Sequence, residues 1–324
     1  MVQSFRELSE EGQIKELTAL AHVILAKYDL TPATVEMINH GYNSTLGVVT
    51  EEGEKFALRI NVNSPRSNAN LRAEIAWILA LNAEGSTPLP RPIPTSTDEL
   101  IAYEWSDALD RSTPAILFSW LDGEEVNELQ DFEEPLLAAG RLMANLHMLG
   151  RDFQMPNDAG LKTFDDVLWG FDDHLRTSEG PLNQADRDLF THALLNISAT
   201  VDRLYQSTQS QIIHADLHGG NLMWDGKTLS VFDFDDCGIG LPIQDLGVSL
   251  YYFREPENRA NLLKGYTQIS ELPPHEDGDL RTLFLQRRLQ LLNYLLESET
   301  ASHRELIESF LEISRTEATA FLEG

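Results

Sequence analysis

The sequence of 324 residues contains one cysteine, Cys237, and few basic side chains. A single cysteine excludes an intramolecular disulfide framework and suits a reducing compartment. The chain has 24 Lys and Arg residues against 52 Asp and Glu residues, which gives a formal charge of −28. Nucleic acids and anionic membranes bind to basic surfaces, so this composition argues against both as partners.

Long hydrophobic runs are also missing. No stretch approaches the ~20 apolar residues that a membrane helix needs, and the N-terminus lacks the basic start and apolar run of a signal peptide. Hydrophobic residues still make up 42% of the chain, which is enough for a packed core. We therefore expect a soluble, cytoplasmic protein of one large domain or two lobes. The sequence does not define its oligomeric state.

The acidic residues are unevenly distributed. Residues 1–115 contain 9 basic and 16 acidic side chains, whereas residues 116–324 contain 15 and 36. The net charges are therefore −7 and −21. A cationic partner would be attracted mainly to the second segment, although an acidic surface can also simply keep a protein soluble.

The first third of the chain predicts a small α+β unit. Its helical segments show apolar residues at helical spacing, and its hairpin has a Glu-Gly turn at 52–53. Gly85 is the expected end of the second helix. The predicted elements are a helix, a β-hairpin, a second helix and two strands, over residues 4–29, 35–60, 68–84, 99–105 and 115–121.

The rest of the chain predicts a mainly helical unit. One island at 211–236 interrupts the helices with short β-like runs and turns. A β-rich first part, an apolar strand as hinge and a helical second part indicate a two-lobed plan. The predicted helices cover residues 133–150, 184–206, 257–270, 279–298 and 302–322.

Three polar residues of the island have the spacing of a kinase catalytic loop. The segment HADLHGGN at 214–221 places Asn221 five residues after Asp216, and Asp233 follows twelve residues later. Phosphoryl transfer needs an acceptor hydroxyl held in line and Mg²⁺ bridging the phosphates. The carboxylate of Asp216 can accept the hydroxyl proton. The oxygens of Asn221 and Asp233 are hard ligands that suit Mg²⁺.

The longer segment HADLHGGNLMWDGKTLSVFDFDDCGIGLPIQDLG, residues 214–247, resembles the signature of the aminoglycoside phosphotransferase/choline kinase family. That pattern is H-G-D-x-x-x-x-N, then D-F, G-x-P and D-L. Asp235 and Asp236, which follow Asp233-Phe234, resemble the branch of homoserine-kinase-like proteins and bacterial stress-response kinases. One departure is Ala215, where the family usually has Gly.

The resemblance implies an α+β, two-lobed, protein-kinase-like fold, with a small β-rich N-lobe at 1–117 and a larger, mainly helical C-lobe at 118–324. It also implies that His214 braces the catalytic loop and that Asp245 hydrogen-bonds the loop backbone. An alternative from the residues alone is a zinc cluster of His214, Asp216 and His218. That alternative leaves the spacing of Asn221 and Asp233 unexplained.

The nucleotide-binding residues are less sharply marked. Gly41, Asn43 and Ser44, with Tyr42, lie between two strand candidates, where N–H groups and polar side chains could cover phosphates. A plain hairpin turn is the alternative reading.

The strand FALRI, residues 56–60, aligns with the family strand that carries the phosphate-binding cation, which puts Arg59 where protein kinases have Lys. Lys55 has the same strand parity and could substitute. Glu74 is the expected partner of Arg59, and an ordinary surface ion pair is the alternative.

The segment AILFSWLDGEE, residues 115–125, resembles the strand and hinge that bind adenine in this family. The expected ligands are backbone groups around Ser119 and Leu121. Phe118 and Trp120 are expected to pack, because aromatic residues in such a strand more often belong to a core.

The predicted function is phosphorylation of a hydroxyl on a small, amine-bearing molecule with ATP and Mg²⁺ as cofactors, in the manner of aminoglycoside, choline or homoserine kinases. Two alternatives stay open, a protein Ser/Thr kinase of the stress-response type and a nucleotide-binding regulator with little turnover. Acidic candidates for contacting the amine, which could also form a solvated face, are Asp165, Asp166, Asp172, Asp173 and Asp236.

Overall fold

The protein is described by a computed structural model, which covers residues 5–41, 43–62, 64, 66–177, 182–297 and 301–324. The chain divides into two compact units. Unit 1 comprises Met1–Gly123, Met155–Gly160 and Ser230–Asp235, and unit 2 comprises Glu124–Gln154, Leu161–Leu229 and Asp236–Gly324. The expected lobe boundary between residues 117 and 118 stays a prediction.

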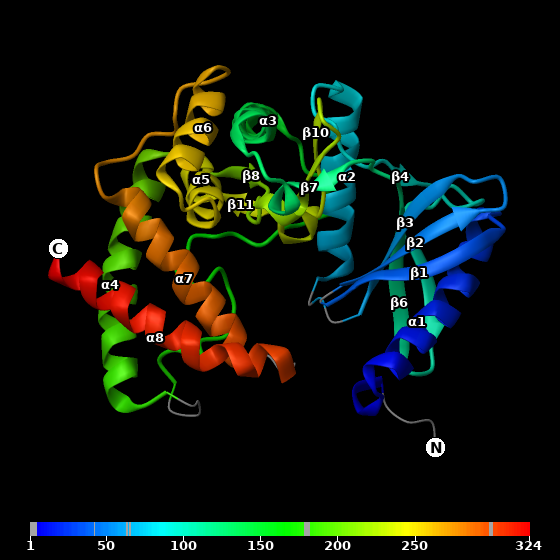
Figure 1. Cartoon of the computed structure of the whole chain (residues 1–324), viewed down its shortest axis with the longest axis horizontal. Coiled ribbons are helices and arrows are strands. Elements are labelled where there is room, and N and C mark those ends of the chain that lie inside the picture. Colours follow the sequence, from blue (N-terminus) through cyan, green and yellow to red (C-terminus); the bar gives the residue numbers. More distant parts are fainter. Residues whose placement is uncertain (1–4, 42, 63, 65, 178–181, 298–300) are drawn as a thin grey trace. The chain divides into compact units, whose positions relative to one another are not determined.

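Unit 1 is built on an antiparallel sheet with the order β1-β2-β3-β6-β4, in which β5 also pairs with β6 (Figure 1). Val48 and Leu46 of β2 alternate with less buried neighbours, because successive strand residues face opposite sides. Gly53, with φ 85°, closes the β2–β3 hairpin at the expected Glu-Gly turn. The strands are β1 Pro32–His40, β2 Asn43–Thr50, β3 Lys55–Asn61, β4 Pro92–Ile93, β5 Ala102–Ser106 and β6 Arg111–Ser119.

Two helices accompany this sheet. α1 (Glu10–Leu25) is shorter than the expected helix 4–29, because Ser9 caps it by accepting the N–H of Gly12 at 3.2 Å. α1 packs its apolar face into the core of the sheet. α2 (Asn68–Glu84) follows the expected bounds and ends at Gly85, which has φ 79°.

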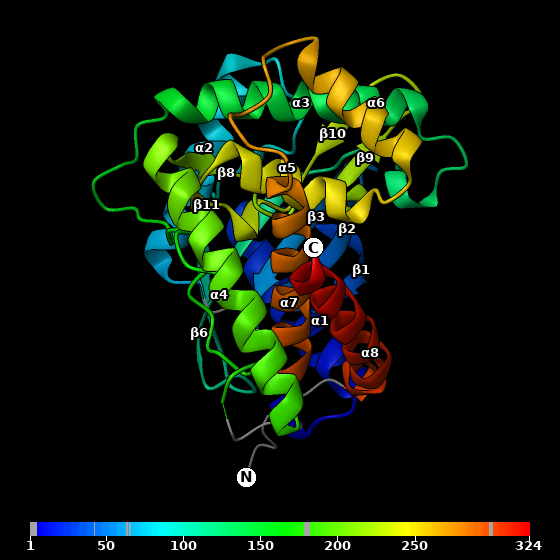
Figure 2. The same ribbon diagram turned by 90° about the vertical axis from the view of Figure 1, so that its left-hand side faces the viewer.

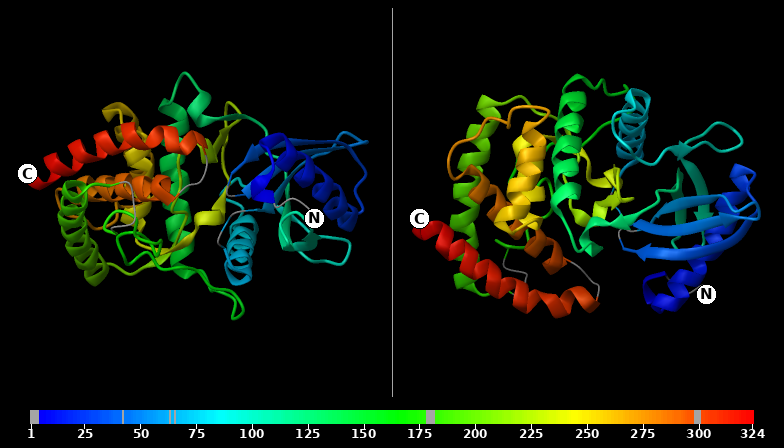
Figure 3. Two further views of the ribbon diagram at one scale, coloured as in Figure 1. Left: turned by 90° about the horizontal axis from the view of Figure 1, so that it is seen from below. Right: turned by 45° about the horizontal axis from the view of Figure 1, so that its top comes forward.

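Unit 2 is mainly helical, and the five helices expected there are confirmed within one to three residues. Figure 2 shows α4, α7 and α8 as neighbours, and α7 also runs beside α8 in Figure 3. No helix in the described ranges is both long and apolar enough to cross a bilayer. The helices are α3 Glu133–Asp152, α4 Gln184–Ser207, α5 Pro242–Tyr252, α6 Pro256–Thr267, α7 Asp279–Glu297 and α8 Ala301–Glu323.

Helix α5 is absent from the elements predicted from the sequence. Every residue of α5 from Pro242 to Tyr251 is buried, so the helix has no exposed polar face and no amphipathic period that would indicate it. Pro242 at its first turn was the available signal. α5 matters for function because it carries Asp245.

The expected β island is confirmed as short strands. β8 (Gln211–Ile213) pairs antiparallel with β11 (Gly238–Gly240), and β9 (Leu222–Trp224) pairs with β7 (Glu124–Glu125). β10 (Leu229–Val231) crosses the boundary between the units in sequence. The catalytic-loop segment therefore lies between β8 and β9.

Helices α3 and α6 cross where each presents a glycine. A Cβ on Gly140 would lie 2.0 Å from the carbonyl oxygen of Leu262, and a Cβ on Gly265 would lie 2.1 Å from that of Leu137. Contacts this short cannot be relieved by side-chain rotation, because the obstructing atoms belong to the backbone. Only glycine allows the two helices to approach this closely.

We predict that Gly140→Ala lowers the free energy of unfolding by at least about 2 kcal/mol, because α3 and α6 must separate. Urea unfolding measures this change. Gly160→Ala is the matched control, since its Cβ meets nothing within 4 Å and should change stability little. An equal effect of the two substitutions would contradict the close helix crossing.

Candidate active site

The catalytic-loop segment is anchored by the buried carboxylate of Asp245. Oδ2 of Asp245 accepts the N–H of His214 at 3.1 Å, and Oδ1 accepts the N–H of Ala215 at 2.8 Å. Ser249, one turn further along α5, donates its hydroxyl to the carbonyl of Leu217 at 2.6 Å. The expected contact between Asp245 and the loop backbone is confirmed.

Asp245 also interacts with a buried chain of polar groups. Its Oδ2 lies 3.1 Å from Nε2 of His147, and Nδ1 of His147 lies 2.9 Å from the hydroxyl of Tyr266. Burial alone would raise the pKa of Asp245, but the hydrogen bond and charge of His147, then His214 and the Ala215 N–H, hold it below its usual value. Burial raises the pKa of Tyr266. The phenol therefore donates to Nδ1, and Nε2–H donates to the carboxylate.

The residue that departs from the family pattern has a left-handed backbone. Ala215 has φ 68°, a region that costs an L-residue about 1–2 kcal/mol and glycine almost nothing. Its methyl group is buried in a cluster with Phe164 and Trp169. The family preference for Gly at this position thus has a backbone reason, and Ala215 is tolerated at a cost.

Asp216 is held from two sides within unit 2. Its Oδ1 forms an ion pair with Nη2 of Arg287 on α7, and its Oδ2 lies 3.5 Å from Nε2 of His218. Burial alone would raise the pKa of Asp216, but Arg287, followed by His218 and His214, holds the pKa below its usual value. The carboxylate is therefore ionised near neutral pH and can accept a proton.

Asn221 is oriented for an oxygen-seeking ligand. Its Nδ2 donates to the carbonyl oxygen of Asp216 at 2.9 Å, which identifies Oδ1 as the atom that is left to bind a cation. Amide and carboxylate oxygens are the donors that Mg²⁺ prefers. Asn221 thus fits a metal site. In unit 1, the side chain of Asp233 carries a carboxylate and is 48% exposed.

The nucleotide-binding candidates of unit 1 centre on a buried ion pair. Nη1 and Nη2 of Arg59 donate to the two carboxylate oxygens of Glu74 at 2.7 and 2.6 Å, so the expected pair is present. Oδ1 of Asp233 lies 3.8 Å from Nη1 of Arg59. Burial alone would lower the pKa of Arg59, but Glu74, followed by Asp235 and Asp233, raises it, and Arg59 stays charged. Its contact with phosphate stays a prediction.

The competing cation, Lys55, has a different environment. It is exposed, and its Nζ lies 5.8 Å from the ring centroid of Trp120. Arg59 also lies against an aromatic ring, 5.4 Å from the centroid of Phe118. Only Arg59 of these two cations is fixed by a buried carboxylate, so we favour it as the phosphate contact.

The predicted turn between β1 and β2 is partly occupied by its own hydrogen bonds. The N–H of Gly41 donates to the carbonyl of Asn43 at 3.1 Å. Ser44 is fully buried, and its hydroxyl lies 2.8 Å from Nδ1 of His40. The side chain of Ser44 therefore supports the turn from inside, and any phosphate contact at this residue has to come from its backbone. Tyr42 lies outside the described residues.

The predicted adenine contact at Ser119 is partly occupied too. The N–H of Ser119 donates to the carbonyl of Arg91 at 2.8 Å, and its hydroxyl accepts the N–H of Arg91 at 2.9 Å. Phe118 is buried, in keeping with its expected packing role. The backbone of Leu121 stays the predicted adenine partner.

Several acidic candidates for an amine contact instead stabilise turns. Asp166 accepts the N–H of Leu168 at 2.8 Å, and Asp173 accepts the N–H groups of Leu175 and Arg176 at 3.0 Å. Asp165 accepts the hydroxyl of Thr163 at 3.0 Å. Asp172 and Asp236 are exposed and stay candidates.

The zinc-cluster alternative has no support in the described ranges, where no group of three or more His, Cys, Asp and Glu side chains is arranged to hold a metal ion. Nδ1 of His214 accepts the N–H of Asp216 at 3.3 Å, and Nδ1 of His218 accepts that of Gly220 at 3.0 Å. These lone pairs are used to shape the loop. The expectation that His214 braces the loop agrees with this contact.

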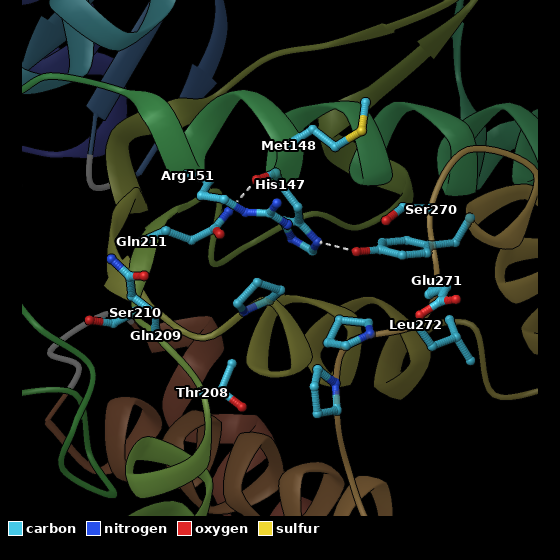
Figure 4. A pocket seen from close by; sticks show the side chains of 14 residues that line it. His147, Met148, Arg151, Thr208, Gln209, Ser210, Gln211, Ser270, Glu271 and Leu272 are labelled. Atoms are coloured by element: carbon cyan, nitrogen blue, oxygen red, sulfur yellow. Dashed lines mark hydrogen bonds between the residues drawn. The ribbon is translucent and has the colours of Figure 1, made fainter.

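A pocket of about 500 Å³ lies elsewhere in unit 2, beside His147 (Figure 4). Arg151 and Met148 of α3 line it together with Tyr266 and the loop at 270–274. None of the predicted site residues lines this pocket. The catalytic-loop segment, rather than this pocket, therefore stays the predicted site of the chemistry.

The sequence analysis missed Arg287 and Tyr252. Arg287 lies 71 residues beyond Asp216 in the chain, and nothing local to the motif indicates that α7 returns to it. One available signal was the pair Arg287-Arg288 inside the otherwise apolar helix sequence LFLQRRLQLL. Two adjacent cations within such an apolar helix sequence suggest that each has a specific partner.

The phosphotransferase enzyme family model matches residues 34–280 of the chain. Because this match covers most of the sequence, including the catalytic loop and the ion pair of unit 1, the chain belongs to the phosphotransferase enzyme family. The expected family resemblance and the expected enzyme class, a phosphotransferase, are confirmed.

Curated relatives and solved structures agree with this assignment. Amicoumacin kinase of Bacillus subtilis is 26% identical over 241 residues, which cover 69% of this chain and 68% of that protein. Stress response kinase A of Salmonella typhi is 23% identical over 254 residues, covering 76% and 72%.

Among solved structures, a microcompartment-associated aminopropanol kinase has a TM-score of 0.81 at 23% identity, covering 94% of this chain and 97% of that one. A spectinomycin phosphotransferase has a TM-score of 0.61 at 13% identity, covering 94% of this chain and 98% of that one. These similarities confirm the expected kinase-like fold class.

We predict that the left-handed backbone makes Ala215→Gly less harmful than a matched substitution in a helix. Ala144 of α3 is also fully buried. Ala144→Gly therefore removes the same methyl group as Ala215→Gly, and both substitutions raise the entropy of the unfolded chain equally. Ala144→Gly should therefore cost about 1–2 kcal/mol more than Ala215→Gly. Thermal or urea unfolding of both variants measures the difference, and equal losses would contradict strain at Ala215.

Proposed function

We propose that the protein transfers the γ-phosphoryl group of ATP, with Mg²⁺, to a hydroxyl of a small, amine-bearing molecule. The observation that carries this proposal is the conformation of the catalytic loop. Asp216 is ionised and held by its neighbours, while Asn221 is tied to the backbone of Asp216 with its side-chain oxygen left for a cation. Family membership supports the reaction class.

Each residue has a separate part in this proposal. Asp216 accepts the proton of the acceptor hydroxyl, and Asn221 and Asp233 would hold Mg²⁺. When bound, Mg²⁺ would supply positive charge that neutralises the charge on the transferred phosphoryl group. Arg59 contacts the phosphates and is oriented by Glu74, whose two hydrogen bonds fix the guanidinium plane.

The remaining nucleotide contacts are proposed from the backbone. The turn at Gly41 and Asn43, with the backbone of Ser44, covers the phosphates. The hinge at Ser119 and Leu121 binds adenine, and the occupied N–H of Ser119 assigns most of that contact to Leu121.

The reaction is an in-line displacement. The acceptor oxygen forms a bond to the γ-phosphorus as the bond between that phosphorus and the oxygen retained by ADP breaks. The hydroxyl proton passes to Asp216 and then to water. The acceleration comes mainly from positioning and charge neutralisation, because a loose transition state needs little covalent help from the protein.

The acceptor is proposed to be a cationic amino alcohol. The net charge of −21 on residues 116–324 supports the attraction of an amine, and Asp172 and Asp236 are exposed carboxylates in that segment. Similarity to the amicoumacin kinase and the aminopropanol kinase supports a small-molecule acceptor. The buried thiol of Cys237 is compatible with the proposed cytoplasmic location.

A protein hydroxyl is the second candidate acceptor. Similarity to a serine/threonine protein kinase of Salmonella typhimurium, 23% identical over 84% of this chain, supports it.

ATP consumption should be measured with aminopropanol, choline, homoserine, an aminoglycoside or a generic protein substrate, each with and without Mg²⁺. Stimulation by an amino alcohol supports the first candidate. Stimulation by the protein substrate only supports the second candidate. Tight ATP binding without stimulation by any acceptor supports a nucleotide-binding regulator.

We predict that Asp216→Asn lowers kcat by at least about 100-fold while the affinity for Mg²⁺-ATP changes little. The substitution removes the proton acceptor and replaces the carboxylate by an amide of the same shape. Asp225→Asn is a control at an exposed turn of unit 2 and should leave kcat unchanged. Steady-state kinetics and nucleotide titration measure both quantities. Full activity of the Asp216 variant would contradict its assignment.

A further inference from the structure

Arg287 reaches Asp216 from a helix that the catalytic motif does not contain. Nη2 of Arg287 forms the ion pair with Oδ1 of Asp216 and also donates to the hydroxyl of Tyr252 at 3.1 Å. The side chain of Arg287 is 13% exposed, and its Nε is buried without a hydrogen-bond partner in the described part of the chain. Its hydrogen bonds to Asp216 and Tyr252 therefore have to offset much of the cost of burying this charge.

The two oxygens of Asp216 have different neighbours as a result. Oδ1 is occupied by Arg287, whereas Oδ2 faces His218 at 3.5 Å. Nδ1 of His218 accepts the N–H of Gly220, so Nε2 carries the proton of the neutral ring. A contact of 3.5 Å is long for a hydrogen bond, which leaves Oδ2 the better acceptor for an incoming hydroxyl.

We propose that Arg287 is a positioning residue of the acceptor site, which fixes the carboxylate of Asp216 so that Oδ2 takes the proton of the acceptor hydroxyl. The proposal rests on the proposed function. In the transfer, the O–H bond of the acceptor breaks as its oxygen bonds to phosphorus, the bond to ADP breaks, and the proton rests on Oδ2 before passing to water. Oδ1 stays paired with the guanidinium throughout.

This arrangement has a consequence for acceptor selection. Arg287 cancels the charge of Asp216 at short range, so Asp216 itself attracts an acceptor amine only weakly. Asp236 also interacts electrostatically with Arg287 and is exposed. The amine should therefore be recruited by carboxylates such as Asp236, while Asp216 recognises the hydroxyl.

The test varies the residue that holds Oδ1 and measures the transfer step. Loss of the guanidinium removes the ion pair that fixes one oxygen of Asp216. The transfer step, which needs Oδ2 in place, should slow, while nucleotide binding should change little.

Four proteins should be compared: wild type, Arg287→Gln, Arg287→Lys and Arg288→Gln. Arg288 is the matched control, because it is a buried arginine of the same helix that pairs with Glu317 instead of Asp216. With the best acceptor, we expect Arg287→Gln to lower kcat by at least tenfold and to leave KM for ATP within twofold. Arg287→Lys should recover part of kcat, and Arg288→Gln should leave kcat unchanged.

A wild-type kcat in folded Arg287→Gln would overturn the positioning role, and so would equal losses in Arg287→Gln and Arg288→Gln. If Arg287→Gln does not fold, a kcat of Arg287→Lys equal to that of the wild type would overturn it. Absence of turnover in the wild-type protein with every acceptor would instead contradict the proposed function, so the two failures are distinguishable.

Discussion

The catalytic loop depends on one buried carboxylate, that of Asp245. It is fully buried, yet it stays ionised because the N–H groups of His214 and Ala215 and the ring of His147 all donate to it. These contacts connect the loop to α5 and, through His147 and Tyr266, to α3 and α6. Loss of Asp245 would leave several buried donors unpaired at once. The close glycine crossing joins α3 and α6, the two helices that carry His147 and Tyr266.

Charge is organised locally against the overall excess of acid. The chain carries −28 and is proposed to bind ATP, which is itself an anion, so cations have to be fixed where phosphate is handled. In unit 1, Arg59 is fixed by both oxygens of Glu74. In unit 2, Arg287 balances Asp216. The acidic excess of the second segment is therefore not concentrated on the proposed proton acceptor, and exposed carboxylates are better placed to attract an amine.

The sequence predicted most of the fold because its elements carry periodic or capping signals. The α2 helix was found from its apolar spacing and Gly85, and the β2–β3 hairpin from its Glu-Gly turn. The spacing of Asp216, Asn221 and Asp233 led to the proposed chemistry, which stays a prediction, and the Arg59–Glu74 pair was expected from family resemblance. α5 was missed because burial on all sides removes amphipathic periodicity. Arg287 was not predicted because its partner, Asp216, is 71 residues away in the chain. The hydrogen bond that occupies the N–H of Ser119 depends on the pairing of distant segments, which the sequence does not indicate.

We propose that phosphate moves from ATP to the hydroxyl of a small amino alcohol. Phosphorus-31 NMR of a mixture of protein, ATP, Mg²⁺ and an amino alcohol tests this transfer directly, because it separates a phosphate monoester from inorganic phosphate. We expect one equivalent of a new phosphomonoester for each ADP formed, and no such signal without protein. Formation of ADP with inorganic phosphate alone, or with phosphate retained on protein, for every amino alcohol tried would contradict it.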